Sequence, residues 1–154
     1  MKINTSRFGT LTLKEEKIIH MPAGMLGFPD RKRFVILKHR EDSPFFWYQS
    51  VDDPDLAFVI TSPFLFHPEY DVDLTEALKG MSWDPVKKDV ILLYVVVTIP
   101  RGCPHKMTGN FIGPIIVNLE KSQAVQTVIA NSPYTHNYPL MQAKEKNQTS
   151  HHPG

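Results

Sequence analysis

The sequence is poor in cysteine, in long apolar runs and in net charge. Its single cysteine, Cys103, cannot form an intramolecular disulfide or a cysteine-rich zinc site. The longest apolar run, residues 90–97, is far shorter than the roughly 20 residues that a membrane helix needs. Residues 1–13 lack the apolar core of a signal peptide. Seventeen basic and sixteen acidic residues give a net charge of +1, so no overall field attracts nucleic acid or a membrane. We therefore expect a cytoplasmic protein without membrane contact.

Proline, by contrast, is abundant, with 13 among 154 residues against a usual share of about 5%. Proline breaks helices but is tolerated at strand ends and in turns. Short segments rich in β-branched and aromatic residues recur between the prolines and other turn residues, which is typical of strands. The predicted strands are residues 8–13, 17–21, 34–37, 45–51, 56–61, 90–99, 107–110, 115–119 and 124–129.

The close spacing of these strands predicts an all-β fold. We expect one small, antiparallel, β-barrel-like domain over residues 1–140. Residues 8–13 and 17–21 are expected to form a hairpin through a charged turn. Residues 90–99 are mostly branched and apolar, which predicts a strand buried on both faces.

Helical signals are confined to one place. Asp73 and Glu76 have the spacing of a capping box, and Gly80 can end a helix, so one short helix is predicted near residues 73–80. Residues 141–154 lack periodic apolar positions, and we expect them to form a flexible polar tail.

No arrangement of side chains predicts a catalytic, cofactor or metal site. Cys103 and His105 lie two residues apart in a proline-containing loop, a geometry that seldom lets a base activate a nucleophile. The seven histidines are scattered and lack the spacing of a metal motif. The carboxylate cluster Asp52, Asp53 and Asp55 lacks the central glycine of a calcium loop and is typical of a turn between strands. We expect no enzyme activity and no bound cofactor.

Charge is unevenly distributed along the chain. Five basic residues lie between positions 31 and 40, whereas residues 51–78 contain seven acids and no Lys or Arg. The acidic stretch also contains aromatic residues, and aromatic anchors with a charged rim are typical of protein-binding surfaces. The candidate partner-binding residues in this stretch are Asp52, Asp53, Asp55, Phe64, Phe66, Glu69, Tyr70 and Asp71. The alternative is that the aromatic side chains fill the core while the acids are merely solvated.

The basic run keeps a second class of function open. A small β-barrel with exposed aromatic rings can bind single-stranded nucleic acid by stacking, and residues 45–48 are Phe-Phe-Trp-Tyr. However, Glu41 and Asp42 adjoin the basic run. Neighbouring residues of a strand also point to opposite faces, so at most two of these four rings can share a face. A nucleic-acid-binding β-barrel is therefore the alternative function.

Several segments, in order, resemble those of a known family. They are TSRFG at 5–9, IHMPAGMLGF at 19–28, PFFWYQS at 44–50, LAF at 56–58, PEY at 68–70, TGNFIGP at 108–114, IIVN at 115–118 and AVQTVI at 124–129. The second is close to the signature FP.GLPGF and the sixth to T.NL.AP, both of the flagellar assembly factor FliW family. The resemblance extends over residues 5–140. Where the family has Leu and Ala, this sequence has Phe111 and Gly113, which leaves partner contacts near Asn110 open.

The resemblance implies a small β-barrel-like domain without catalysis. Proteins of this family bind flagellin in the cytoplasm and also bind CsrA, an RNA-binding translational repressor, and the two partners compete. When flagellin is secreted, the freed factor sequesters CsrA, and flagellin mRNA is translated again. The resemblance thus implies flagellin and CsrA as partners, and no direct contact with nucleic acid.

Two hypotheses concern individual residues. Because CsrA must present cationic surface to RNA phosphates, we place its contact at or near the acids between Asp52 and Glu76. Asn110 is a further candidate contact residue. The alternative for Asn110 is a structural role, in which its amide forms hydrogen bonds with backbone groups of a loop between strands.

Overall fold

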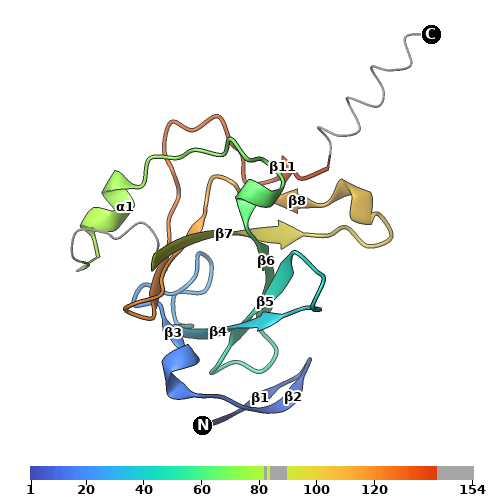
Figure 1. The fold of residues 1–154 in the computed structure, drawn as a ribbon, viewed down its shortest axis with the longest axis vertical. Coiled ribbons are helices and arrows are strands. Elements are labelled where there is room, and N and C mark those ends of the chain that lie inside the picture. The colour runs from blue at the N-terminus through green and yellow to red at the C-terminus, as the bar shows by residue number, and fades with distance from the viewer. Residues whose placement is uncertain (82, 84–89, 142–154) are drawn as a thin grey trace.

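The computed structural model describes residues 1–81, 83 and 90–141. Within these residues the regular secondary structure is mostly β-sheet, and loops connect the strands (Figure 1). The strands are β1 (Lys2–Thr5), β2 (Gly9–Thr12), β3 (Ile19–His20), β4 (Arg33–Lys38), β5 (Phe45–Ser50), β6 (Ala57–Thr61), β7 (Ile91–Thr98), β8 (Thr108–Gly109), β9 (Ile115–Asn118), β10 (Gln123–Gln126) and β11 (Tyr138–Pro139). The predicted all-β fold is confirmed.

The main sheet closes on itself as a ring of hydrogen-bonded strands. The order around the ring is β7-β6-β5-β4-β3-β10-β9, and β9 pairs again with β7. The long strand β7 makes this closure possible, since its first half pairs with β9 and its second half with β6 and β8. All neighbouring pairs in the ring are antiparallel except β3–β10, which is parallel. Strand β11 extends the sheet beyond β8.

Alternation along the strands divides the side chains between the inside and the outside of the ring. On β5, Phe46 and Tyr48 belong to the inner cluster, and Phe45 and Trp47 point outward. Inside, the rings of Phe34 and Tyr48 stack with centroids 4.5 Å apart, and both residues are fully buried. The inner cluster therefore forms the centre of the hydrophobic core.

Two further clusters cover parts of the outer face. Above β7 in Figure 1, the connections before α1 and after β8 bury Tyr70, Phe111 and Leu140 against outward residues of β7. Below β4, the hairpin β1–β2 and the following 3₁₀ helix (Glu15–Lys17) bury Ile3 and Ile18 against Val35. Side chains on the outer face of the sheet between these two clusters remain only half-buried.

One sequence prediction about strand pairing is wrong. Strand β2 pairs with β1, in the register Lys2 with Thr12, and not with residues 17–21. The residues after β2 form the 3₁₀ helix Glu15–Lys17 in place of a tight turn, and β3 then pairs with β4 and β10. The hairpin partner was missed because β1 is short and polar and has little strand signal of its own.

The predicted short helix is present as α1 (Thr75–Lys79), the one α-helix in the described residues. It is shorter than the predicted range, residues 73–80. The Asp73 side chain accepts a hydrogen bond from the Thr75 backbone N–H at 2.9 Å just before the helix begins. Nearly all of the predicted tail, namely residues 142–154, lies outside the described residues. No helix in the described part of the chain has the length and apolarity to span a bilayer.

The stacked pair inside the ring generates a stability test. Replacing Phe34 with Ala removes a fully buried ring and its contact with Tyr48, so we expect the free energy of unfolding to fall by about 3–5 kcal/mol. Leu65 is 63% exposed, and Leu65→Ala is expected to change it by no more than about 0.5 kcal/mol. Urea denaturation measures the free energy of unfolding of both variants. An equal decrease in the two would contradict the placement of Phe34 in the core.

Candidate functional site

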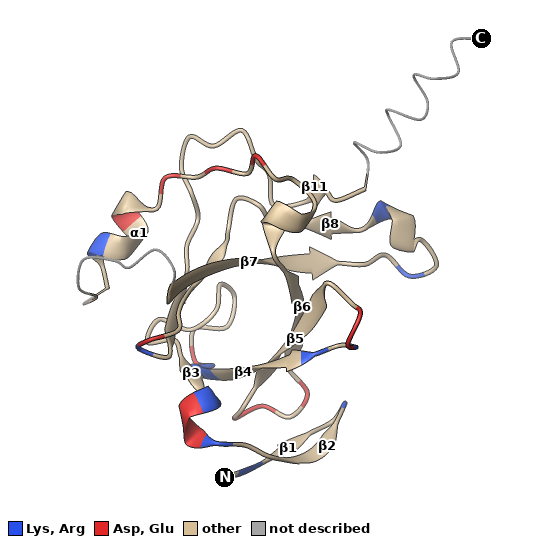
Figure 2. Ribbon diagram, in the orientation of Figure 1, with Lys and Arg blue, Asp and Glu red and all other residues tan. Residues whose placement is uncertain are grey.

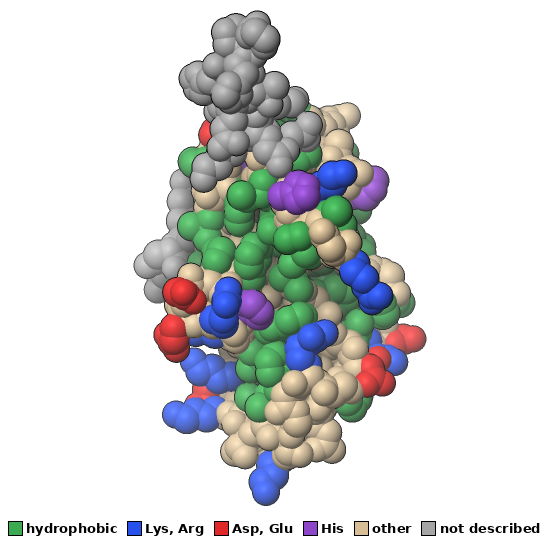
Figure 3. Space-filling view, turned by 90° about the vertical axis from the view of Figure 1, so that its right-hand side faces the viewer, with side chains coloured by type: hydrophobic (Ala, Val, Ile, Leu, Met, Phe, Trp, Pro, Cys, Tyr) green, Lys and Arg blue, Asp and Glu red, His purple; other side chains and the backbone are tan. Residues whose placement is uncertain are grey.

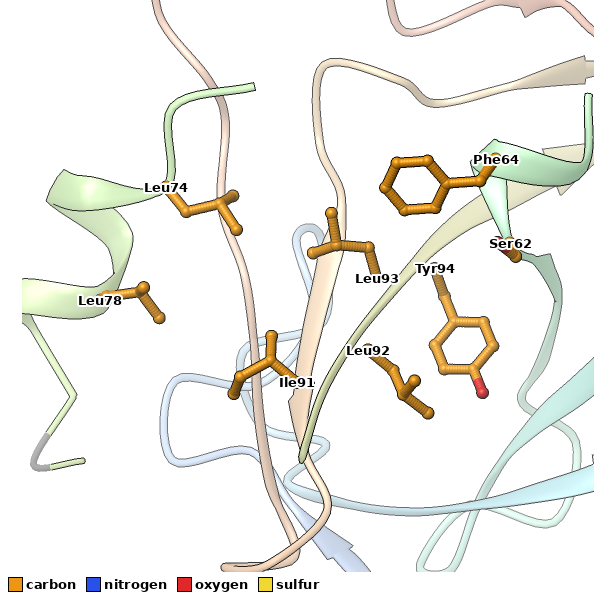
Figure 4. Close-up of a pocket in the computed structure, with 8 residues that line it drawn as sticks. All are labelled: Ser62, Phe64, Leu74, Leu78, Ile91, Leu92, Leu93 and Tyr94. Carbon is orange, nitrogen blue, oxygen red and sulfur yellow. The ribbon is translucent and has the colours of Figure 1, made fainter. Parts of the chain in front are cut away.

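An apolar groove of about 500 Å³ lies between α1 and the beginning of β7. It is lined by Ser62, Phe64, Leu74, Leu78, Ile91, Leu92, Leu93 and Tyr94. Figure 4 shows Leu74 and Leu78 pointing from the helix toward Ile91 and Leu93, and Phe64 facing them from the other side. Such a concave apolar surface can accept apolar side chains of a partner.

The local sequence explains how the two walls of the groove form. Leu74 is the N-cap residue of α1, and Leu78, four residues later, lies on the same side of this turn, since its N–H donates to the Leu74 carbonyl at 2.9 Å. Ile91 and Leu93 alternate with Leu92, which belongs to the inner cluster, so they lie on the outer face of β7. The sequence of residues 90–99 predicts a strand buried on both faces. The structure leaves residues 91–94 only half-buried, so that prediction is wrong for the first half of β7.

Exposed acids lie along the segment that leads to this groove. Glu69, Asp71, Asp73 and Glu76 are all exposed, and Figure 2 shows the acidic positions along this connection and on α1. Hydrogen bonds from Thr75 lower the pKa of Asp73, and Glu76 forms an ion pair with Lys79 at 3.3 Å. The groove thus combines an apolar floor with an acidic border.

The aromatic candidates of this stretch have different environments. Phe64 is 41% exposed and lines the groove. Phe66 is half-buried and stacks on Phe45 with centroids 6.0 Å apart. Tyr70 is buried, and its hydroxyl donates a hydrogen bond to the Phe111 carbonyl at 2.7 Å. Burial raises the pKa of Tyr70, so the hydroxyl keeps its proton. Tyr70 therefore supports the fold, and Phe64 is the aromatic residue of this stretch that best fits a contact surface.

The structure does not bring the candidate acids together in one place. Asp52, Asp53 and Asp55 lie in the turn between β5 and β6, across the ring from the acids beside the groove (Figure 2). Arg33 contacts Asp52 through two hydrogen bonds of 2.5 and 3.1 Å, and Arg31 contacts Asp53 at 3.2 Å. The hydroxyl of Ser6 donates a hydrogen bond to Asp55.

These contacts correct the view of two separate charged stretches. Arg31 and Arg33 belong to the basic run, and they partly neutralise Asp52 and Asp53 of the acidic run. The two runs meet because β4 and β5 are antiparallel neighbours, which places the start of β4 beside the end of β5. The surface is therefore mixed in charge at this turn and acidic along the segment beside the groove.

Asn110 follows β8, and its backbone N–H donates a hydrogen bond to the Val96 carbonyl at 2.9 Å. Its side-chain carbonyl oxygen is buried and has no hydrogen-bond partner in the described part of the protein. The structural role considered for Asn110 therefore gains no support from this oxygen and stays a prediction. A Cβ added at Gly113 would lie 2.8 Å from the Asn110 amide nitrogen, so the two residues are in close contact.

The aromatic run 45–48 is divided as its alternation predicted. Phe46 and Tyr48 face the inner cluster, and Tyr48 is fully buried. Phe45 and Trp47 remain on the outer face and are half-buried. Within residues 1–81, 83 and 90–141, no group of three His, Cys, Asp or Glu side chains is placed to hold a metal ion.

The groove residues Leu74, Leu78, Ile91 and Leu93 were not among the candidates from sequence. The four-residue spacing of Leu74 and Leu78 was a usable signal, since it predicts an apolar face on a helix otherwise rich in polar residues. Which part of the sheet this face approaches could not be read from the chain.

Comparison with known proteins decides the family. The family model described as FliW protein matches residues 2–140. The chain belongs to the FliW family. A flagellar assembly factor FliW of Geotalea uraniireducens is 41% identical over 150 residues, which cover 97% of this chain and 90% of the relative. One of Caldanaerobacter subterraneus is 37% identical over 154 residues, covering 98% and 99% of the two chains.

A solved structure supports the same family. This chain is similar to the crystal structure of a flagellar assembly factor FliW, with a TM-score of 0.81 and 32% sequence identity. The similarity covers 91% of this chain and 96% of the other. The FliW family and its fold, both expected from the sequence motifs, are confirmed.

The Arg33–Asp52 pair has a testable pH dependence. The hydrogen bond from Arg33 lowers the pKa of Asp52 in the folded protein below its ordinary 3.8. The pair's stabilisation is therefore present above that ordinary pKa and is lost as the pH falls toward the lowered one. Because both side chains are more than a third exposed, we expect Asp52→Asn to lower the free energy of unfolding by at most about 1 kcal/mol at pH 7. Urea denaturation between pH 7 and pH 3 should show this difference in the free energy of unfolding shrinking as the pH falls below about 4.

Arg33→Gln provides the control for this pair. In that background the guanidinium is absent, so Asp52→Asn should change the free energy of unfolding little at any of these pH values. An unchanged cost in both backgrounds would show that the pair does not stabilise the protein.

The environment of Asn110 generates a second stability test. Asn110→Ala removes a buried carbonyl oxygen that has no hydrogen-bond partner and therefore removes the free-energy cost of burying it. This stabilisation offsets the packing against Gly113 that the substitution removes. We expect the free energy of unfolding to change by less than about 1 kcal/mol. Thermal unfolding followed by circular dichroism measures this free energy. A decrease of more than about 2 kcal/mol would instead support a structural role for Asn110, in which its amide stabilises the loop.

Proposed function

We propose that this chain is a non-enzymatic, cytoplasmic flagellar assembly factor that binds flagellin and antagonises CsrA by protein–protein contact. In this role it couples flagellin synthesis to flagellum assembly. Membership of the FliW family supports a role in flagellar assembly. The observation that carries the contact with CsrA is the apolar groove bordered by exposed acids.

Physical chemistry connects this groove with a regulator that binds RNA. A protein that neutralises phosphates carries Lys and Arg on its surface, and an acidic surface attracts it and orients it. The groove contributes the apolar contact area that an interface needs at its centre. The same acids, held close to a bound repressor, repel RNA phosphates.

Competition between partners follows from a shared surface. While flagellin occupies the factor, CsrA is free to repress; when flagellin is exported, the factor binds CsrA, and flagellin mRNA is translated. Single-stranded RNA is a weaker alternative as a direct ligand, because two of the four rings of the run 45–48 lie inside the ring of strands. A gel shift across salt concentrations tests this alternative, since direct RNA binding would appear without CsrA and would weaken steeply with salt.

Charge reversal beside the groove tests the proposed contact. We expect Glu69→Lys combined with Asp71→Lys to weaken CsrA binding about tenfold and to flatten its dependence on salt, because both acids are exposed on the acidic border. Isothermal titration against the CsrA of the same organism at two salt concentrations measures both effects. The matched control is Glu15→Lys with Glu120→Lys, which changes the charge equally at exposed positions elsewhere.

A second set of variants locates the contact. Asp52→Lys, Asp53→Lys and Asp55→Lys together test the turn between β5 and β6, where we expect a smaller loss because Asp52 and Asp53 already contact arginines. A loss confined to this triple variant would place CsrA at that turn. Wild-type affinity and salt dependence in both variants would contradict an acidic contact.

A further inference from the structure

A row of apolar side chains crosses the outer face of the sheet on the side away from α1. Leu37, Trp47 and Val59 are direct partners across β4, β5 and β6, and the row continues to Val97 on β7. Directly opposed residues of antiparallel strands point to the same face. Because Phe46 and Tyr48 face inward, this row faces outward.

We define the outer strip as Leu37, Phe45, Trp47, Val59 and Met107, all of which are half-buried. The strip lies between the two covered parts of the outer face: Leu37 packs on the lower cluster, and Phe45, Val59 and Met107 pack on the upper one. Figure 3 shows a band of hydrophobic side chains along this face, with Lys, Arg, Asp and Glu side chains on both sides of it. A continuous apolar band on the surface marks an interaction site.

Basic residues border the outer strip at both ends. At the lower end, the Arg7 guanidinium lies 3.9 Å from the centre of the Trp47 ring. At the upper end, Arg101 and Lys106 are exposed in the segment between β7 and β8. Residues 90–119 contain no Asp or Glu at all. The turn between β4 and β5 adds the exposed Lys38 and Arg40 together with the exposed acids Glu41 and Asp42. The border of the strip is therefore mixed but predominantly basic, opposite in sign to the border of the groove.

We propose that the outer strip is a docking surface for an acidic amphipathic helix of a partner protein. Val97 at the end of the row is buried, so the accessible part of the row runs from Leu37 on β4 to Val59 on β6. It covers two strand spacings, or about 10 Å, which corresponds to roughly six to seven residues of helix. A helix lying across the strands presents one apolar residue per turn, with a 5.4 Å pitch close to the strand spacing of about 4.8 Å. Acidic residues on its flanks then meet Arg7 at one end and Lys106 at the other.

The geometry favours such a helix over single-stranded nucleic acid, which aromatic and basic residues can also bind. Stacking of bases needs a free ring face. Arg7 covers one face of Trp47, and Phe8 and His39 contact the same ring with centroids 6.1 and 6.0 Å away. Phe45 already stacks on Phe66. The two rings of the strip therefore act as apolar surface.

This surface goes beyond the proposed function, because it is separate from the groove between α1 and β7. The two lie on opposite sides of the ring of strands (Figures 1 and 3). Their border charges have opposite signs, so a basic partner selects the groove and an acidic partner selects the strip. Both can be occupied at the same time.

A designed peptide tests the outer strip directly. The probe is a fluorescein-labelled helical peptide of about 14 residues with leucines on one face and Glu on the flanks, and its matched partner has Lys in place of every Glu. We expect the Glu peptide to bind the full-length protein at micromolar concentration by fluorescence anisotropy, and the Lys peptide to bind at least about tenfold more weakly.

Variants of the protein then assign the binding to the strip. Arg7→Glu with Lys106→Glu should weaken binding of the Glu peptide about tenfold, a loss of 1.4 kcal/mol. Lys14→Glu with Lys121→Glu makes the same charge change at exposed positions away from the strip and should have no effect. Leu78→Asp, in the groove, should also leave this peptide's affinity unchanged. A peptide that still binds after CsrA has saturated the protein supports two separate surfaces.

Three results would overturn the inference. The first is equal affinity for the Glu and Lys peptides, and the second is equal weakening by the two pairs of charge reversals. The third is binding of a single-stranded RNA oligonucleotide, lost in the variant with Arg7→Glu and Lys106→Glu, without binding of the Glu peptide. These three results are all obtained without CsrA, so they test the outer strip independently of the proposed function; only the saturation experiment requires CsrA binding.

Discussion

Closure of the ring through β7 is the constraint on which the rest of the structure depends. Strand β7 pairs with β9 along Ile91–Tyr94 and with β6 along Val95–Val97, so the sheet returns to its start. A closed sheet has one inner face, which large apolar residues must fill, and one outer face, which other segments must cover. The inner face is filled by the cluster around Phe34 and Tyr48.

The outer face is covered only in part, and two of its open parts in the described residues are the groove and the outer strip. Beside α1, the outward residues of the first half of β7 form the floor of the groove. Across β4, β5 and β6, the row through Trp47 stays half-exposed between the two outer clusters. Charge then distinguishes these surfaces. The net charge of +1 is the sum of regions with different charge. The border of the groove is acidic and that of the strip is predominantly basic, and arginines at the start of β4 form ion pairs with acids after the end of β5.

Much of the fold could be predicted from the sequence, and the errors have physical causes. The strands with strong apolar and β-branched signals, β4 to β7, were predicted within two residues of their observed ends. Strand β1 was missed, because a short polar strand is stabilised by its partner and not by its own residues. Of the candidate site residues, Phe64 lines the groove, and Glu69 and Asp71 are exposed on the segment between Phe64 and Leu74. Tyr70 is buried, and Asp52 and Asp53 contact arginines.

The sequence by itself determined the all-β class, the family and the alternation that sends Phe46 and Tyr48 inward, because these depend on residue types and local spacing. Only the tertiary structure decided which charges meet and which apolar residues stay accessible. Arg33 and Asp52 are 19 residues apart, and Leu78 and Ile91 face each other across a groove. Such pairs arise from the register and closure of strands distant in the chain, which no local pattern encodes.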